Sequence, residues 1–414
     1  MKVYLESNCC IRRNSEIVKL EKYFMLNDYK KINNPKDADY IILSTCAFKE
    51  QEESYSLSRL RYLKGFPGKL LVLGCLPDIS PTKFSEFSGV SSIAPKEIEK
   101  IDSFFPKAIV KYSEIEDMNI IPDEITVSSL PTAVQKLRNE FELSSTFGLR
   151  IIRYLEKKIR IILRLNISKF YLNISRGCLG NCSYCAIKRA IGTLVSQPID
   201  GIVNQFYDGL ERGYKDFIIL GDDVGAYGRD DGQTFPNLLS RLVNELELIT
   251  KKESGKNGNF NDVGFHIQEI HPKWLILYKQ TLLNLITSKK IKSILCPIES
   301  GNDRVLDMMN RRYNVDEILE FFQTARFIYP EIELSTHVMV GFPSETDEEF
   351  EDSLRVVSKI HFDKVTVFPY DLKEGTTASG IIPQVDEQTI RERLQKAQEY
   401  FKGENIKTFL SCPD

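Results

Sequence analysis

The sequence is poor in histidine and tryptophan and has no long hydrophobic run. Its 414 residues include four histidines and one tryptophan, and no stretch of eighteen apolar residues occurs, which argues against a membrane span. The first residues run directly into a strand-like pattern and lack the apolar core of a signal peptide. We therefore expect a cytoplasmic protein without a membrane partner, in which thiols stay reduced.

The sequence also lacks an excess of charge of either sign. The formal net charge is −3, which excludes no class of partner, because a local basic patch is enough to bind nucleic acid. One such patch lies between Lys136 and Lys169 and has the apolar spacing of an amphipathic helix. It fits a connecting helix with a solvated basic face as well as an RNA or peptide contact.

Cysteine is the residue type that carries chemical information here. Three of the nine cysteines, Cys178, Cys182 and Cys185, form a C-x3-C-x2-C triplet with no histidine nearby. Structural zinc is usually closed by a fourth Cys or His, whereas a 4Fe-4S cluster has four irons normally held by four cysteines. Three thiolates therefore predict a cluster with one iron open to a small molecule. Zinc and buried core thiols are the alternatives.

The first part of the chain alternates short apolar runs with helical segments, which predicts a parallel sheet with crossover helices. The expected strands are 2–5, 40–43 and 69–73, and the first expected helix is 15–26. Cys9 or Cys10, Cys46 and Cys75 follow these strands in turn. Ligands of such sheets bind beyond the carboxyl ends of the strands, so the pattern favours a second cluster with three protein ligands. Chance convergence of buried cysteines is the alternative.

The pattern resumes after residue 169. The expected strands are 170–175, 216–220, 263–267, 291–298, 333–340 and 364–368, with helices at 199–212, 235–248, 315–327, 346–360 and 387–402. Six strand and helix units are too few for a closed eight-fold barrel and predict an open, partial one. The triplet follows the first of these strands, at the face where such barrels carry their active sites.

Ordered motifs along the chain resemble those of the radical S-adenosylmethionine (SAM) methylthiotransferases, which replace a C–H bond by C–SCH3. The matching segments are the triplet loop, the upstream cysteines with 44–47 and 74–76, and 221–228, 299–306, 309–313, 341–346, 368–370 and 374–376. The triplet loop is most similar to that of the archaeal and eukaryotic branch that modifies threonylcarbamoyladenosine at position 37 of tRNA. The resemblance implies an α/β fold: a flavodoxin-like parallel-sheet domain (1–130), a basic linker helix (131–166) and a partial (β/α)6 radical SAM barrel (167–414).

The resemblance also implies the cofactors, two 4Fe-4S clusters and SAM. Cys178, Cys182 and Cys185 would hold the SAM-cleaving cluster. Cys9, Cys46 and Cys75 would hold an auxiliary cluster that carries the sulfur, with Cys10 as the alternative to Cys9. The residues expected near SAM are Tyr184, Asp223, Gly341, Phe342 and Pro343. A reduced flavodoxin or ferredoxin-type protein would donate electrons, and no catalytic residue is expected beyond the cluster ligands, since general bases cannot deprotonate an unactivated C–H bond.

Some positions depart from the family pattern. The turn before Ser15 is one residue short, and Cys9 is favoured as the ligand because it needs the smaller adjustment. Asp222 and Glu299 stand where glutamines are usual and His337 where Asp is common, so we assign these three to a changed substrate site. Because no C-terminal β-barrel (TRAM) follows helix 387–402, we expect a peptide or protein side chain as the substrate, for example in a ribosomally made peptide. The tRNA adenosine is the alternative.

Two other interpretations compete with the methylthiotransferase one. The chain could be a metal- or RNA-binding protein without catalytic activity, or a radical SAM enzyme whose second cluster only transfers electrons. The intact triplet spacing and the upstream cysteines favour an enzyme with two open clusters. Cys296 and Cys412 fit no cluster motif and are interpreted as structural or incidental.

Overall fold

The computed structural model describes residues 1–119, 121, 169–252 and 260–411. The first described unit is a five-stranded sheet in the order β2-β1-β3-β4-β5, and all its strand pairs are parallel. The strands are β1 (Lys2–Ser7), β2 (Lys30–Ile32), β3 (Tyr40–Thr45), β4 (Lys69–Gly74) and β5 (Ser91–Ile93). This is the strand order of flavodoxin-like folds, whose ligands bind where the order reverses, between β1 and β3.

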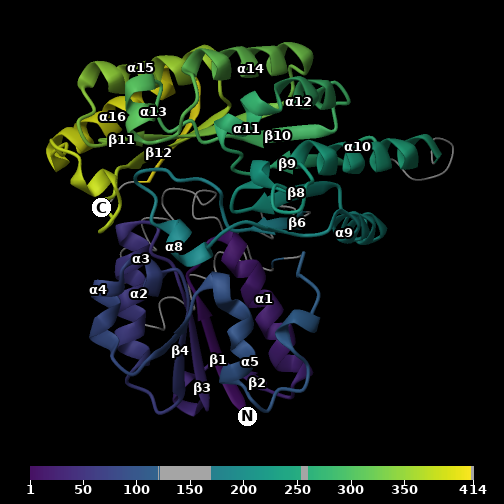
Figure 1. Cartoon of the computed structure of the whole chain (residues 1–414), viewed down its shortest axis with the longest axis vertical. Helices are drawn as coiled ribbons and strands as arrows, with labels where there is room; N and C mark the ends of the chain where they lie inside the picture. The colour runs from purple at the N-terminus through teal and green to yellow at the C-terminus, as the bar shows by residue number, and fades with distance from the viewer. Residues whose placement is uncertain (120, 122–168, 253–259, 412–414) are drawn as a thin grey trace.

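Helices pack on the strands of this sheet (Figure 1). They are α1 (Ile11–Leu26), α2 (Glu50–Leu63), α3 (Leu76–Ile79), α4 (Pro81–Phe84) and α5 (Ile101–Phe104). In α1, Ile17, Leu20 and Phe24 recur at helical spacing and are buried against the sheet, as expected for an amphipathic helix that covers a sheet face.

The second unit is an eight-stranded sheet in the order β13-β12-β11-β10-β9-β8-β6-β7. Its strands are β6 (Lys169–Arg176), β7 (Val195–Ser196), β8 (Asp216–Gly221), β9 (Gly264–Ile267), β10 (Ile291–Leu295), β11 (Glu333–Val340), β12 (Lys364–Pro369) and β13 (Lys407–Leu410). All neighbours are parallel except the short edge strand β7, which is antiparallel to β6. The six predicted barrel strands are therefore present, in chain order across the sheet.

Helices follow most of these strands. They are α8 (Ile187–Ile191), α9 (Ile199–Glu211), α10 (Phe235–Lys252), α11 (Pro272–Leu277), α12 (Lys279–Ile286), α13 (Asp303–Met308), α14 (Val315–Ile328), α15 (Asp347–Ile360) and α16 (Glu387–Gly403). Figure 1 shows α14 and α15 on the outer side of this sheet, away from the first unit. Helix α15 starts with a capping box, in which the side chains of Thr346 and Glu349 each accept a backbone N–H of the other.

The two units are in direct contact. Helix α8, which follows the triplet, packs against α3, and its Ala190 belongs to a buried cluster formed mainly by the first unit. A buried ion pair joins Glu53 of α2 to Lys373, with Lys373 Nζ at 2.9 Å from Glu53 Oε2. The triplet loop is thus held between two cores.

Four strands were not expected from the sequence. Strands β2, β5 and β7 have only two or three residues, too few for a readable period of two. Strand β13 lies after α16 and extends the sheet beyond β12, whereas the predicted barrel ended with a helix. The predicted linker helix 131–166 and Cys412 lie outside the described residues, and the surface loop expected at 251–262 lies partly outside them.

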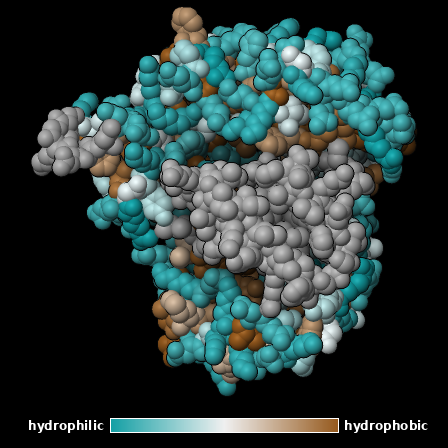
Figure 2. Space-filling view, turned by 180° about the vertical axis from the view of Figure 1, so that it is seen from behind, coloured by the Kyte–Doolittle hydropathy of each residue, from teal (hydrophilic) through white to brown (hydrophobic). Residues whose placement is uncertain are grey.

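Seen from behind, most of the described surface is hydrophilic, with small hydrophobic patches (Figure 2). Within the part of the chain that the structure describes, no helix is both long enough and apolar enough to cross a membrane.

Candidate active site

A cavity of about 1740 Å³ lies between the two units and takes walls from both. Seven of the nine cysteines line it: Cys9, Cys10, Cys46, Cys75, Cys178, Cys182 and Cys185. The structure therefore brings the triplet and the upstream cysteines, more than a hundred positions apart in the chain, to one space. The sequence predicted an edge of each sheet for each group, but not that the two edges face each other.

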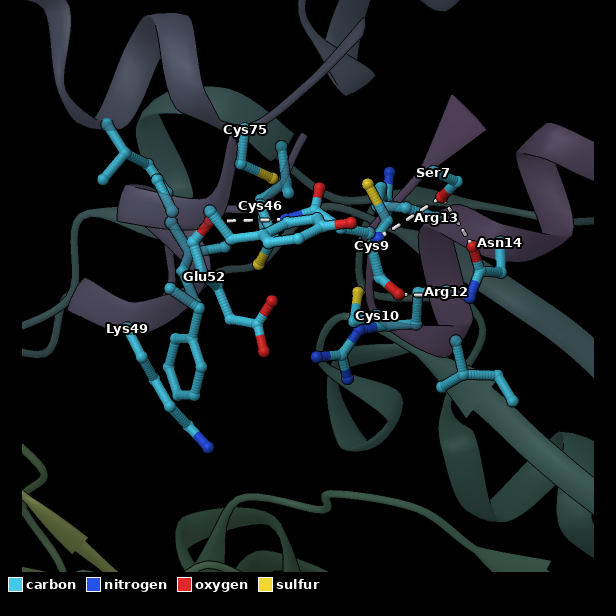
Figure 3. A pocket seen from close by; sticks show the side chains of 18 of the residues that line it. Ser7, Cys9, Cys10, Arg12, Arg13, Asn14, Cys46, Lys49, Glu52 and Cys75 are labelled. Atoms are coloured by element: carbon cyan, nitrogen blue, oxygen red, sulfur yellow. Dashed lines mark hydrogen bonds between the residues drawn. The ribbon is translucent and has the colours of Figure 1, made fainter. Parts of the chain in front are cut away.

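The upstream cysteines gather at the carboxyl ends of three adjacent strands (Figure 3). Cys46 directly follows β3, Cys75 directly follows β4, and Cys9 and Cys10 lie between β1 and α1. Because β1 and β3 are neighbours at the point where the strand order reverses, this is the ligand-binding edge of a doubly wound sheet. The expected convergence on one edge is observed.

Two glycines fix the backbone just before a cysteine. Gly74 and Gly177 have φ of +94° and +83°, and a Cβ there would lie 2.2 Å from Thr45 O and 1.9 Å from Thr193 O, respectively. No L-residue with a side chain fits at either position. The direction in which Cys75 and Cys178 leave their strands is therefore set by the backbone.

Cys9 and Cys10 both reach the cavity, and they differ in their surroundings. Cys9 is half-buried and its Sγ lies 2.9 Å from Ser44 Oγ, whereas Cys10 is exposed and is the N-cap residue of α1. Burial first, and then the neighbouring Cys46 thiol, raise the pKa of Cys9. Cys10 also acts on the pKa values of Cys46 and Cys75, so the choice of Cys9 as the ligand stays a prediction.

We expect Cys9→Ala to lower the iron content of the reconstituted protein from about eight to about four per chain, since one of two 4Fe-4S sites loses a ligand. Cys10→Ala is the matched control and should retain about eight irons. Iron and sulfide analysis after anaerobic reconstitution measures both. The reverse pattern would assign Cys10 as the ligand.

Burial keeps the thiols around the cavity protonated while no metal is bound. Burial is the main factor that raises the pKa of Cys46, Cys75 and Cys178, and it raises that of Cys185 to about 11. Iron–sulfur ligands must be deprotonated, so cluster binding would release protons here. The described His, Cys, Asp and Glu residues form no group of three tight enough for a single metal ion; the cysteines stand around the cavity walls.

The triplet loop carries features that fit an anionic cluster. The backbone N–H of Gly180 donates to Cys178 Sγ at 3.0 Å, the kind of hydrogen bond that tunes cluster sulfurs. Arg311 Nη1 lies 3.8 Å from Cys182 Sγ, and its Nε is buried with no hydrogen-bond partner among the described residues. A buried guanidinium with an unused donor beside a thiol favours a negatively charged group at the triplet. The residues present therefore fit a 4Fe-4S cluster.

Tyr184 faces the cavity and is tied to the same arginine. Arg311 Nη1 donates to Tyr184 Oη at 3.0 Å. Burial raises the pKa of Tyr184, against the lowering effect of Arg311. Glu299 lines the same part of the cavity, and burial raises its pKa as well. Arg311 is a site residue that sequence reasoning missed, although it stands in the motif 309–313.

The other residues expected near SAM lie in two places. Asp223 lines the cavity, accepts the indole N–H of Trp274 at 2.8 Å and lies 3.5 Å from Cys178 Sγ. Gly341, Phe342 and Pro343 are not part of the cavity wall. The Phe342 ring is fully buried behind Tyr184, with 6.5 Å between ring centroids.

Asp222 lines the cavity, and its carboxylate links the two cysteine groups. Its carboxylate accepts Arg13 Nη2 at 3.0 and 3.1 Å and the backbone N–H of Gly177 at 2.9 Å, and Arg12 Nε lies 3.3 Å away. Burial alone would raise the pKa of Asp222, but Arg13 and Arg12 outweigh it and hold the pKa below its ordinary value. Because Asp222 also lines the cavity, its contact with substrate stays a prediction beside these ion pairs.

Arg12 and Arg13 were missed by sequence reasoning. They lie on the first turn of α1, two and three residues after Cys10, and reach across to the barrel, where Arg12 Nη1 also lies 2.5 Å from Glu269 Oε2. Their only signal in the sequence is that they lie near a cysteine motif. The partners of their ion pairs lie more than two hundred residues away in the chain, and no local pattern predicts such a pair.

Two family models match the two units. Residues 172–357 match the radical SAM superfamily, and residues 2–94 match a family described as uncharacterized protein family UPF0004. Together they cover the strands that carry all seven cavity cysteines.

Curated relatives extend over most of the chain. It is 28% identical over 383 residues to a probable threonylcarbamoyladenosine tRNA methylthiotransferase of Pyrococcus horikoshii, which covers 92% of this chain and 79% of the relative. It is 29% identical over 385 residues to a tRNA-2-methylthio-N6-dimethylallyladenosine synthase of Caldicellulosiruptor saccharolyticus, with 90% and 72% covered.

Solved structures share the fold. The radical SAM methyltransferase TsrM of Kitasatospora setae, solved with tryptophan and a SAM analogue, superposes with a TM-score of 0.56 at 11% identity, covering 91% of this chain and 74% of that one. The expected fold, a parallel-sheet domain joined to a radical SAM barrel, is confirmed.

Proposed function

We propose that the chain is a radical SAM methylthiotransferase that converts a C–H bond of an adenosine in tRNA to C–SCH3, with threonylcarbamoyladenosine 37 as the target. It is a transferase that uses SAM and two 4Fe-4S clusters. The single observation that carries the proposal is that both cysteine groups line one cavity. A substrate atom there can meet both cofactors at once.

The proposed role of the protein is to hold two reactive groups around one atom. Cys178, Cys182 and Cys185 hold one cluster, and Cys9, Cys46 and Cys75 hold the other. When bound, the cluster at the triplet would cleave SAM to the radical that removes the hydrogen, and the cluster at the upstream cysteines would supply the sulfur. Because no general base can deprotonate such a C–H bond, fixing both groups at short range is the main contribution of the fold.

The other cavity residues bind and orient. Arg311 keeps a positive charge beside Cys182 and fixes the phenol of Tyr184 by its hydrogen bond. Asp222 ties the start of the triplet loop to α1 through Gly177 and Arg13. The proposed electron donor, a reduced flavodoxin or ferredoxin-type protein, would act from outside the cavity.

The sequence favoured a peptide as the substrate, and this expectation is replaced here by tRNA. That preference depended on altered polar residues and on the expectation that no β-barrel follows helix 387–402. Asp222, one of the altered residues, is occupied by Arg13, Arg12 and Gly177, so its change from glutamine needs no new substrate. Two relatives are named probable threonylcarbamoyladenosine tRNA methylthiotransferases and a third a tRNA-2-methylthio-N6-dimethylallyladenosine synthase, and these names support the tRNA alternative.

We expect the reconstituted protein, given SAM and a reductant, to add one SCH2 unit to tRNA that carries the unmethylthiolated nucleoside. Nucleoside mass spectrometry after digestion measures the gain. A parallel reaction with candidate peptides is the control and should show none. A gain on the peptide alone would contradict the proposal.

A further inference from the structure

One wall of the cavity combines two aromatic rings with a lysine, and nothing assigned so far uses it. Phe48 and Lys49 follow Cys46 by two and three residues, and Phe368 lies on β12 across the domain boundary. The Phe48 and Phe368 rings meet edge to face at 6.2 Å, and Lys49 Nζ lies 4.5 Å from the centroid of Phe368. Figure 3 shows Lys49 and Glu52 on the Cys46 side of the cavity.

Lys49 differs from most other cations of the cavity in having no acidic partner at ion-pair distance. Arg12 and Arg13 pair with Asp222, Arg59 pairs with Glu6, and Lys373 pairs with Glu53. Within the described residues Lys49 forms no salt bridge, although it is half-buried. Burial lowers its pKa even though Glu52 and Cys46 act to raise it. A partly desolvated ammonium of this kind is stabilised by an anion brought in with the substrate.

Phe48 offers a flat apolar face beside this cation. Its side chain is 48% exposed although it lines the cavity. Exposed aromatic rings in such places are typical stacking partners for an unstacked nucleobase. A base on Phe48 would lie next to the Cys46 side of the sulfur-donating site, where the proposed reaction needs it.

We infer that Lys49, together with Phe48 and Phe368, forms the subsite for the modified adenine, with Lys49 binding an anionic substituent on the base. The inference rests on the proposed function and narrows it. A threonylcarbamoyl group carries a carboxylate that can pair with Lys49, whereas a dimethylallyl group is a hydrocarbon and cannot. The wall therefore selects a carboxylate-bearing adenosine.

The test compares RNA binding by the reconstituted full chain under anaerobic conditions. Fluorescence anisotropy is measured with anticodon stem-loops that carry threonylcarbamoyladenosine, dimethylallyladenosine or plain adenosine. Lys49→Met should weaken binding of the threonylcarbamoyl stem-loop roughly 10- to 100-fold, the scale of one charge-assisted contact, and leave the other two within about twofold. Lys49→Arg should restore most of the loss.

Two further variants complete the design. Phe48→Ala should weaken the binding of all three stem-loops alike, by roughly tenfold, because stacking does not depend on the substituent of the base. Lys36→Met is the matched control: Lys36 lines the same cavity but is exposed, and its loss should not discriminate among the stem-loops. Unchanged iron content shows that each variant is folded and loaded.

The outcomes separate this inference from the function it rests on. If wild type and Lys49→Met bind the threonylcarbamoyl stem-loop equally, or if Lys49→Met weakens all three equally, as a phosphate contact would, the inference is overturned while the tRNA function stands. If wild type binds none of the three, the proposed function itself is wrong.

Discussion

A variant with alanine at Cys178, Cys182 and Cys185 is expected to bind about four irons per chain instead of about eight and to form no 5′-deoxyadenosine. In the proposed account the triplet, which follows β6, holds one of two 4Fe-4S clusters, and the other cluster is held on a separate sheet with its own core. The second cluster should therefore survive. Iron analysis and chromatography of the SAM products measure both effects.

The reciprocal variant removes Cys46 and Cys75. It should also bind about four irons, but it should still cleave SAM to 5′-deoxyadenosine while methylthiolation falls to background. Cys296→Ala is the matched control, because Cys296 is fully buried and is not part of the cavity wall. Loss of both activities in both variants would contradict two separate sites, as would retention of eight irons in either.

Asp222→Ala is expected to destabilise the barrel domain by about 3–5 kcal/mol, the cost of leaving one partner of a buried ion pair uncompensated. Arg13 would lose its carboxylate, since both groups are almost fully buried, and the Gly177 N–H would lose its acceptor. Chemical denaturation followed by the fluorescence of Trp274, the single tryptophan, reports on this region because its indole contacts Asp223.

Asp208→Ala is the matched control for this prediction. Its ion pair with Arg212 is exposed, so its loss should cost less than about 1 kcal/mol. A similar small effect for Asp222→Ala would show that the Arg13–Asp222 pair does not hold the two units together.

The carboxylate of Asp222 also makes the free energy of unfolding depend on pH. Because the pKa of Asp222 in the folded protein is held below its ordinary value, the folded state is stabilised at pH above the ordinary Asp range. This contribution is lost as the pH falls through the lowered pKa. The difference in unfolding free energy between wild type and Asp222→Asn should therefore shrink on acidification.

The sequence predicted strands well where the pattern of apolar residues is long and clear. Strands β6, β8, β11 and β12 were expected within one or two residues, because buried parallel strands are continuous apolar runs bounded by polar turns. The short strands β2, β5 and β7 carry no such signal. Strand β13 was missed because its four residues acquire their role only by pairing with β12.

The candidate site was predictable for the residues that occur in spaced motifs. The cysteines are recognisable from spacing alone, and their positions after strands indicate the edge they share. The contacts of Asp222 with Arg12 and Arg13, and of Phe48 with Phe368, join residues from different units. Such pairings depend on how the two sheets face each other, which a single sequence does not contain. Asp222 was therefore assigned to the substrate alone, and its ion pairs with Arg12 and Arg13 were missed.

The most direct test of the two-cluster account is a reaction of the reconstituted protein with SAM that carries a deuterated methyl group and with tRNA that lacks the methylthio group. The account predicts a nucleoside that carries the labelled SCH3 group, formed together with equal amounts of S-adenosylhomocysteine and 5′-deoxyadenosine. Formation of 5′-deoxyadenosine without S-adenosylhomocysteine and without a labelled nucleoside, in protein that contains about eight irons, would contradict it.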